Sequence, residues 1–256
     1  MTNGKTHFGF QEIDEADKPG MVQGLFGSVA NKYDVMNDAM SFGIHRLWKD
    51  ILIDRLSPRP DMQLLDIAGG TGDIATRFLK AGGGNVSICD LTVNMLTEGR
   101  NKFYDSGLLD LSENGGDTPL PIEWVQGDAE ALPFASESQD ACVIAFGLRN
   151  VTHIDRALAD AWRVLKPGGH FLCLEFSHLS LNILQRLYDI YSFKYLPKIG
   201  HFIANDADSY RYLAESIRRF PNQSTLQKLM QQANFVNVSY QNLSQGIVAI
   251  HSGWKI

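Results

Sequence analysis

The chain of 256 residues contains little cysteine, no long apolar run and no excess of positive charge. Its odd number of cysteines (Cys89, Cys142 and Cys173) lie in segments expected to form buried strands, and their spacing does not fit a metal site. We interpret them as reduced core residues, which fits a reducing cytoplasm. No apolar run approaches the length of a membrane span. Residues 1–7 lack the apolar core of a signal peptide, and the acidic residues that follow argue against a transit peptide.

The charge balance is acidic, with 23 basic and 29 acidic residues and a net charge of −6. A nucleic-acid-binding protein would favour a basic stripe, so we expect no nucleic-acid partner. His, Asp and Glu do not cluster at the spacing of metal ligands, and we expect no metal. With 44% hydrophobic residues, the chain is long enough to form one α/β domain with a large core.

A turn of small residues follows an apolar run that contains Asp66. The turn comprises Ala68, Gly69, Gly70, Thr71 and Gly72. Glycines let the backbone turn tightly and let a ligand approach closely. A second apolar run ends at Asp90, where a carboxylate can accept hydrogen bonds from ribose hydroxyls. Together these features predict a nucleoside-bearing cofactor across the ends of parallel strands, and the alternative is a plain tight turn between a strand and a helix.

The form of this turn bears on the choice of cofactor. It departs from the dinucleotide fingerprint, and the absence of a following Gly-Lys-Ser/Thr excludes a P-loop. It resembles the first motif of the S-adenosylmethionine-dependent methyltransferases. Residues 125–134, which include Asp128 and Ala129, resemble the segment of those enzymes in which an acid or amide meets the adenine amino group.

Strands and helices alternate through the middle of the chain, which predicts right-handed crossovers and a parallel sheet. Two late strands joined by a short turn indicate an antiparallel hairpin. We therefore expect an α/β, Rossmann-like methyltransferase fold with a seven-stranded, mostly parallel sheet, an antiparallel terminal hairpin and helices on both faces. The strands are expected at 63–68, 85–90, 122–126, 140–145, 169–175, 235–241 and 246–252, and the helices at 72–80, 93–104, 154–165, 208–217 and 222–233.

The remaining segments complete one domain over residues 1–256. Residues 1–18 are polar and are expected to be loose, and residues 105–121 have the composition of a surface loop. Residues 20–56 are expected to form a helical cap over the cofactor cleft. Residues 179–217 are expected to form a helical substrate lobe.

Segments outside the cofactor motifs resemble the ubiquinone/menaquinone biosynthesis C-methyltransferase family. These are residues 33–48, 146–151, 163–177, 205–217 and 246–251. The resemblance runs from about residue 8 to the end. It implies methyl transfer from S-adenosyl-L-methionine to a ring carbon of a polyprenylated benzoquinol or of demethylmenaquinol. The resemblance does not distinguish these acceptors or give the length of the prenyl tail.

By position, the resemblance assigns several residues to the cofactor. The implied contacts are Asp66, Gly69, Gly70, Thr71, Gly72, Asp90, Asp128, Ala129 and Ala145. Ala145 stands where the family has a serine, so one hydroxyl is missing. Asp128 stands where many relatives have Asn, although either side chain can accept from an adenine amino group.

Methylation of a quinol carbon depends on the ionisation of a ring hydroxyl. The ring becomes nucleophilic when a hydroxyl is ionised, so the site needs a general base or a donor that stabilises phenolate charge, and a dry channel for the tail. We expect Arg149, followed by Asn150, to hold the phenolate or a water that takes its proton. His45 is the titratable candidate, with a structural histidine as the alternative. Glu175 is expected to pair with Arg163 or Arg211 if its role is structural.

Candidate substrate contacts come from both flanks: Tyr33 and Asp34 from the cap, and Asp206 and Tyr210 from the late helical segment. Core packing is the alternative for Tyr33 and Tyr210. Residues 187–198 mix aromatics with lysines, which suits a membrane interface or a helix packed on the substrate lobe.

Two other functions stay open from the sequence. One is methylation of another small hydrophobic acceptor such as a sterol or phospholipid, and the other is non-catalytic binding of a prenyl lipid within a biosynthetic complex. For the main hypothesis, the expected partners are a lipid quinol, a membrane surface contacted peripherally, a second copy of the chain and other quinone-biosynthesis enzymes. We expect a cytoplasmic location, with contact at the inner membrane surface.

Overall fold

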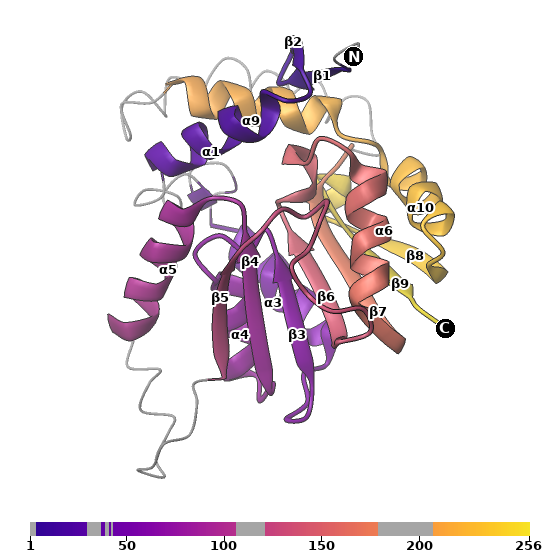
Figure 1. Cartoon of the computed structure of the whole chain (residues 1–256). Coiled ribbons are helices and arrows are strands. Elements are labelled where there is room, and N and C mark those ends of the chain that lie inside the picture. The colour runs from indigo at the N-terminus through magenta and orange to yellow at the C-terminus, as the bar shows by residue number, and fades with distance from the viewer. Residues whose placement is uncertain (1–3, 30–36, 39–40, 42, 106–120, 179–206) are drawn as a thin grey trace.

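A seven-stranded sheet forms the centre of the molecule (Figure 1). The structure, a computed structural model, describes residues 4–29, 37–38, 41, 43–105, 121–178 and 207–256. The strand order is β5-β4-β3-β6-β7-β9-β8. The first five strands are parallel to one another, and β9 pairs antiparallel with both β7 and β8. The strands are β3 (Gln63–Ile67), β4 (Asn85–Asp90), β5 (Ile122–Gln126), β6 (Gln139–Ala145), β7 (Leu165–Phe176), β8 (Val236–Leu243) and β9 (Val248–Trp254). The predicted fold class is confirmed.

Helices cover both faces of the sheet (Figure 1). Those described in full are α1 (Lys18–Val29), α3 (His45–Leu56), α4 (Asp73–Lys80), α5 (Val93–Asp105), α6 (Ile154–Val164), α9 (Ala207–Arg219) and α10 (Gln223–Gln232). Helices α3, α4 and α5 pack on one face, and α6 and α10 pack on the other. The predicted central helices are confirmed, with ends that shift by one or two residues.

The central strands are apolar on both faces because both faces are covered. In β3, Leu64 points into the core beneath α3 and α4, whereas its neighbour Leu65 points into the core beneath α6 and α10. Successive strand residues face opposite sides, so one apolar run serves two cores. Cys89, Cys142 and Cys173 are buried and free, as predicted.

The prediction that residues 1–18 are loose is wrong for residues 5–14, and residues 1–3 lie outside the described residues. Strands β1 (Lys5–Phe8) and β2 (Gln11–Asp14) form an antiparallel hairpin. Its tip is held by a residue far away in sequence: the Phe10 N–H donates to Glu215 Oε2 at 3.0 Å. Strands this short and polar give almost no periodic signal, and the contacts that stabilise them come from α9.

Strand β7 also begins earlier than the predicted residue 169. Leu165 already pairs with Gln139, and the register then shifts before Ala141 pairs with His170. This irregularity lets the segment Lys166–Gly168 belong to a strand despite its turn-forming residues.

Several predictions fall partly or wholly outside the described residues. In the expected helical cap over 20–56, α1 and α3 are described, but residues 30–36, 39–40 and 42 are not. The expected loop at 105–121 is largely outside them, as are residues 179–206 of the expected substrate lobe, including the aromatic segment 187–198. The division of one domain into a core, a cap and a lobe therefore stays a prediction.

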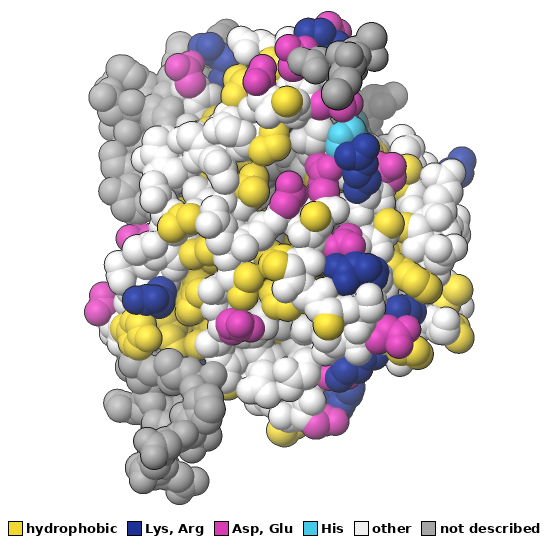
Figure 2. All heavy atoms as spheres, in the orientation of Figure 1, with side chains coloured by type: hydrophobic (Ala, Val, Ile, Leu, Met, Phe, Trp, Pro, Cys, Tyr) yellow, Lys and Arg dark blue, Asp and Glu magenta, His cyan; other side chains and the backbone are white. Residues whose placement is uncertain are grey.

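The described surface mixes charges of both signs. On the face in Figure 2, Lys and Arg side chains are interspersed with Asp and Glu side chains. Within the ranges that the structure describes, no helix is long and apolar enough to cross a membrane. The same residues contain no group of three or more His, Cys, Asp or Glu side chains that could hold a metal ion.

Candidate functional site

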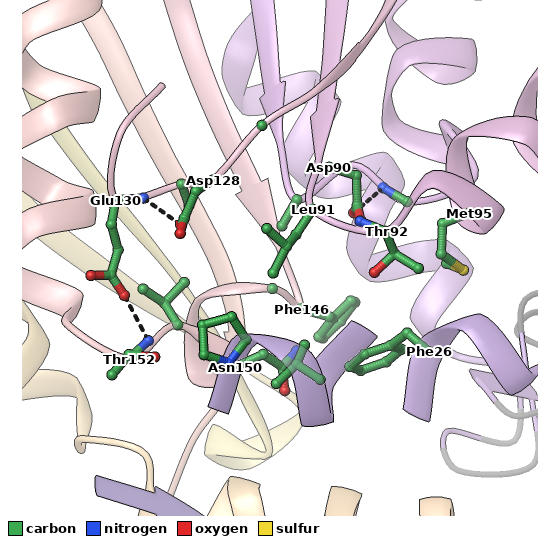
Figure 3. Close-up of a pocket in the computed structure, with 18 residues that line it drawn as sticks. Phe26, Asp90, Leu91, Thr92, Met95, Asp128, Glu130, Phe146, Asn150 and Thr152 are labelled. Carbon is green, nitrogen blue, oxygen red and sulfur yellow. Dashed lines mark hydrogen bonds between the residues drawn. The ribbon is translucent and has the colours of Figure 1, made fainter. Parts of the chain in front are cut away.

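The strand order locates a natural ligand site. From β3 the chain runs outward through β4 to β5 and then returns to β6 on the other side of β3. Ligands in such sheets bind beyond the carboxyl ends of the strands where the order reverses. A cavity with about 750 Å³ of empty space lies at this point, between the strand ends and α1 (Figure 3). We call it the Asp90 cavity, and its position at the ends of the parallel strands is that of a nucleoside-bearing ligand in such sheets.

Asp90 joins two loops at the floor of this cavity. Its Oδ2 accepts from the Gly70 N–H at 2.9 Å, and its Oδ1 accepts from the Thr92 N–H at 2.8 Å. Burial raises the pKa of Asp90, although both backbone hydrogen bonds oppose that change. A carboxylate has further lone pairs for two hydroxyl donors. The predicted contact of Asp90 with a ribose stays a prediction. Gly70, which has a φ of +57°, also lines the cavity.

Asp66 supports the glycine turn from below. Its side chain is fully buried, and neither carboxylate oxygen has a hydrogen-bond partner. A Cβ on Gly69 would lie 2.7 Å from the Asp66 Cγ, so the turn rests directly on this carboxyl group. Burial raises the pKa of Asp66 to about 8. Asp66 does not line the Asp90 cavity, and its predicted cofactor contact stays a prediction.

The opposite end of the cavity is polar. Asp128 and Ala129 line it, and their predicted contact with the cofactor stays a prediction. Asp128 Oδ1 accepts from the Glu130 N–H at 2.9 Å, and Glu130 Oε1 accepts from the Thr152 N–H at the same distance (Figure 3). These bonds hold the loop after β5 against the loop after β6, with the Asp128 carboxylate at the cavity wall.

Much of the wall of the Asp90 cavity consists of apolar side chains that were not predicted from the sequence. Val22 and Phe26 line it from α1, Leu91 and Phe146 line it just after β4 and β6, and Met95 lines it from α5. The side chains of Phe26, Leu91, Met95 and Phe146 are labelled in Figure 3. In the sequence, Val22 and Phe26 show the helical spacing of ordinary core residues. The sequence pattern therefore does not distinguish residues of a cavity wall from residues of the core. The predicted contact Ala145 does not line the cavity, whereas its neighbour Phe146 does.

Arg149 is buried in an ion pair. It lies in the short helix η3 (Leu148–Asn150), and its Nη1 is 2.8 Å from Glu175 Oε1. The same Nη1 donates to the Phe146 carbonyl, and the Arg149 N–H donates to Glu175 Oε2 at 3.3 Å. Burial raises the pKa of Glu175, and the guanidinium opposes this. The expected pairing of Glu175 with Arg163 or Arg211 is wrong.

The two arginines expected beside Glu175 have nearer carboxylates on their own helices. Arg163 pairs with Asp160 on α6 at 2.6 Å, and Arg211 pairs with Asp208 on α9 at 3.4 Å. Glu175 instead pairs with Arg149 of η3. Strands β6 and β7 are adjacent and parallel, so the helix that follows β6 lies beside the end of β7.

Arg149 and Asn150 are neighbours in the chain but line two different cavities. Asn150 lines the Asp90 cavity. Arg149 lines a second cavity, with about 620 Å³ of empty space, between η3, α9 and the N-terminal hairpin. Val151 and Thr152 line both cavities, so they form a shared wall.

His45 and Thr71 lie at neither of these cavities. Both line a third one, which also contains Asp73 and Arg77. His45 Nδ1 is 2.8 Å from Ser41 Oγ, and burial lowers the pKa of His45 to about 4, so the imidazole is neutral at pH 7. The structure therefore does not bring His45 together with Asn150. Thr71 belongs to the glycine turn but lies on its other side.

The predicted substrate contacts lie mostly outside the described residues. Tyr33, Asp34 and Asp206 belong to the undescribed segments. Tyr210, a residue of α9, is fully buried in the core and lines none of the three cavities.

Comparisons with known proteins place this geometry among methyltransferases. The model of the ubiE/COQ5 methyltransferase family matches residues 11–255. The chain is 52% identical over 256 residues to the ubiquinone/menaquinone biosynthesis C-methyltransferase UbiE of Cereibacter sphaeroides, covering 100% of this chain and 98% of the relative. It is 46% identical to the mitochondrial 2-methoxy-6-polyprenyl-1,4-benzoquinol methylase of Bos taurus, covering 98% of this chain and 84% of the relative.

Solved structures share the fold at low sequence identity. A Thermotoga maritima SAM-dependent methyltransferase, described as a possible histamine N-methyltransferase, aligns with a TM-score of 0.62 at 18% identity, covering 91% of this chain and 99% of that chain. Phosphoethanolamine N-methyltransferase 2 of Haemonchus contortus, in complex with S-adenosyl-L-methionine, aligns with a TM-score of 0.57 at 15% identity, covering 82% of this chain and 52% of that chain.

Proposed function

The chain belongs to the ubiE/COQ5 methyltransferase family, and from that membership we propose how its cavities perform the family's reaction. It is an S-adenosyl-L-methionine-dependent C-methyltransferase of ubiquinone and menaquinone biosynthesis, and its acceptor is a lipid quinol. The observation that supports our assignment of the site is the Asp90 cavity, which lies where the strand order reverses and combines the carboxylates of Asp90 and Asp128 with apolar walls.

Asp90 and Asp128 suit the two polar ends of the cofactor's nucleoside. Asp90 can accept from both ribose hydroxyls, and Asp128 can accept from the adenine amino group. Leu91 supplies an apolar surface between them (Figure 3). When bound, S-adenosyl-L-methionine supplies an activated methyl group, so the chain mainly has to align the reactants and exclude water. Val22 and Phe26 of α1 cover the cavity and support water exclusion.

Asn150 is the polar side chain best placed to meet the acceptor. It lines the Asp90 cavity beside Phe146 and Gly147, at the end of β6. Its amide can donate to a quinol oxygen as that oxygen gains phenolate character, which stabilises the charge that makes the ring carbon nucleophilic. Arg149 does not line the Asp90 cavity. It lines the second cavity, on the other side of Val151 and Thr152.

A role for Arg149 can be tested without leaving a buried charge unpaired. Arg149→Ala alone strands the Glu175 carboxylate, which costs about 3–5 kcal/mol of stability in comparable buried pairs. The double variant Arg149→Met/Glu175→Gln removes both charges together. If Arg149 holds the phenolate, kcat falls while S-adenosylhomocysteine affinity is retained. An unchanged kcat with an unchanged pH–rate profile contradicts that role, and the same measurement on His45→Gln tests the predicted base.

The function itself is tested with purified protein. We expect the protein to transfer a labelled methyl group to a short-tailed demethylated benzoquinol or to demethylmenaquinol, detected by mass spectrometry. Calorimetry should show S-adenosylhomocysteine binding that Asp90→Ala abolishes and that Asp61→Ala, a change at an exposed carboxylate, leaves intact. Binding of prenyl lipid without binding of S-adenosylhomocysteine would favour the non-catalytic lipid binder instead.

We also propose that the protein works in the cytoplasm at the inner membrane surface, because a prenylated quinol resides in lipid. Residues 187–198, with aromatics and lysines interleaved, are the segment we propose for this contact. Flotation with anionic liposomes should carry the protein upward, and replacement of the segment's lysines by glutamine should weaken this. Sedimentation analysis tests for the proposed homodimer, and co-purification tests for contacts with other quinone-biosynthesis enzymes.

A further inference from the structure

Tyr212 on α9 contacts the side chain of Asn150 from outside the Asp90 cavity. The Tyr212 hydroxyl donates to Asn150 Oδ1 at 3.0 Å. Tyr212 lines the second cavity, whereas Asn150 lines the Asp90 cavity, so this hydrogen bond crosses between them. Figure 3 shows Asn150 among the residues that surround the Asp90 cavity.

This hydrogen bond determines which end of the amide is free. An asparagine side chain has one acceptor oxygen and one NH₂ group with two donors. With Oδ1 engaged by Tyr212, the NH₂ group is the end left for a ligand. Burial raises the pKa of Tyr212 to about 12, so the hydroxyl keeps its proton and remains a donor.

Tyr212 is itself held in place by the N-terminal hairpin. The ring of Phe8, the last residue of β1, stacks on the Tyr212 ring with centroids 4.1 Å apart and an angle of 25° between the planes. The Phe10 N–H at the hairpin tip donates to Glu215, which is also on α9. The hairpin therefore braces α9 next to Tyr212, the residue whose hydroxyl contacts Asn150.

We propose that Tyr212 is a positioning residue for methyl transfer, because its hydroxyl orients Asn150 so that the amide presents a hydrogen-bond donor to the quinol oxygen. This inference rests on the proposed function. The donor matters most where negative charge develops, since a preorganised donor stabilises the transition state more than the ground state. Without the tyrosine hydroxyl, the amide can rotate and present its oxygen, which repels a phenolate.

Tyr212→Phe tests this with a minimal change, because the ring that stacks on Phe8 is kept. We expect kcat to fall about tenfold, the effect of losing one well-placed hydrogen bond. The KM for S-adenosyl-L-methionine should stay unchanged. The acid limb of the pH–rate profile should move to higher pH, because a less stabilised phenolate raises the pKa of the bound quinol. Tyr240→Phe is the matched control, since Tyr240 is an exposed tyrosine on β8.

A double-mutant cycle separates positioning from general support. If Tyr212 acts through Asn150, adding Tyr212→Phe to Asn150→Ala should cause no further loss of kcat. Independent, multiplicative losses would show that Tyr212 only supports the fold, and would overturn the inference. An unchanged kcat and pH–rate profile in Tyr212→Phe, with an active parent protein, would overturn it as well.

A second variant covers the case in which Tyr212→Phe does not fold. Asn150→Asp keeps an acceptor for Tyr212 but removes the NH₂ donor, without altering α9. We expect kcat to fall at least as far as in Asn150→Ala, and retained activity would overturn the inference. A parent protein that binds S-adenosylhomocysteine yet methylates no quinol would instead contradict the proposed function, so the two failures are distinguishable.

Discussion

At Gly69 the missing side chain is a steric requirement. A Cβ there would meet the carboxyl group of Asp66 at 2.7 Å and Ile88 at 2.8 Å, and both neighbours are buried. We predict that Gly69→Ala lowers the free energy of unfolding by about 1–3 kcal/mol, the usual cost of overpacking. It should also weaken S-adenosylhomocysteine binding, since the displaced turn carries Gly70.

Gly24→Ala is the matched control for this prediction. A Cβ at Gly24, in the middle of α1, meets nothing within 4 Å. Alanine at an open helical position stabilises a protein by about 0.5–1 kcal/mol relative to glycine. Urea titration of both variants gives the comparison, and equal stability of the two would contradict the steric account.

The buried carboxyl group of Asp66 gives the stability a pH dependence. Its pKa is about 8 in the folded chain against an ordinary value of 3.8. Between these values the folded state holds a proton that the unfolded state has lost. Its contribution to stability is therefore complete below about pH 4 and is lost as the pH rises toward 8, at no more than about 1.4 kcal/mol per pH unit.

Asp66→Asn should remove this dependence. We predict that the free energy of unfolding of the variant, measured relative to the parent by urea titration, increases between about pH 5 and pH 7. Asp61→Asn, which replaces an exposed carboxylate, should show a much smaller change. A difference between Asp66→Asn and the parent that does not vary with pH would show that Asp66 is ionised in the folded protein.

Residues were predictable from the sequence where a local pattern marks them. Asp90 closes an apolar strand, and Asp128 lies in a segment that resembles a methyltransferase motif. Both were singled out on these grounds, and both line the Asp90 cavity. The contact of Glu175 with Arg149 and that of Tyr212 with Asn150 could not be predicted, because they span 26 and 62 residues, respectively. Nothing local distinguishes a strand-end glutamate or a helix tyrosine that meets such a partner.

Among the elements, helix α10 has a well-defined beginning. Asn222 lies at its N-cap, and its Oδ1 accepts from the Thr225 N–H at 2.9 Å. We predict that Asn222→Ala lowers the free energy of unfolding by about 1 kcal/mol, because that N–H loses its partner. Asn222→Asp keeps an acceptor oxygen and should stay within a few tenths of a kcal/mol of the parent in urea titration. An equal loss in both variants would contradict the capping role.

Elements were predictable in proportion to their periodicity. The parallel strands each contain a cluster of apolar residues, and their positions follow from the sequence to within a few residues. The N-terminal hairpin was missed because its strands are only four residues long and are stabilised through α9. Tertiary contacts therefore determine the structure of residues 5–14, and their composition alone does not.

For the whole molecule, ligand binding should increase the free energy of unfolding. A ligand present at 100 times its Kd stabilises the folded state by about 2.7 kcal/mol. We predict that S-adenosylhomocysteine raises the Tm of the parent and of Asp61→Ala, and that the same concentration has little effect on Asp90→Ala. Differential scanning calorimetry measures the shift. An equal rise in Asp90→Ala would place the ligand away from the Asp90 cavity.

The fold class was predictable at this scale because alternating strands and helices admit few arrangements. The separate cavities were not predictable from the sequence. They arise where α1, α9 and the hairpin meet the strand ends, and these segments are distant in the sequence.

The contact between the hairpin and α9 also has a consequence for synthesis on the ribosome. Phe10 and Glu215 are 205 residues apart, so the hairpin emerges long before its binding partner exists. At ordinary translation rates this delay lasts about 10–40 s. During that time the earliest part of the nascent polypeptide has nowhere to dock, and the brace on Tyr212 closes only when translation is nearly finished. A ribosome stalled before α9 would hold a chain whose methyl-donor pocket is largely built but whose acceptor side is still unassembled.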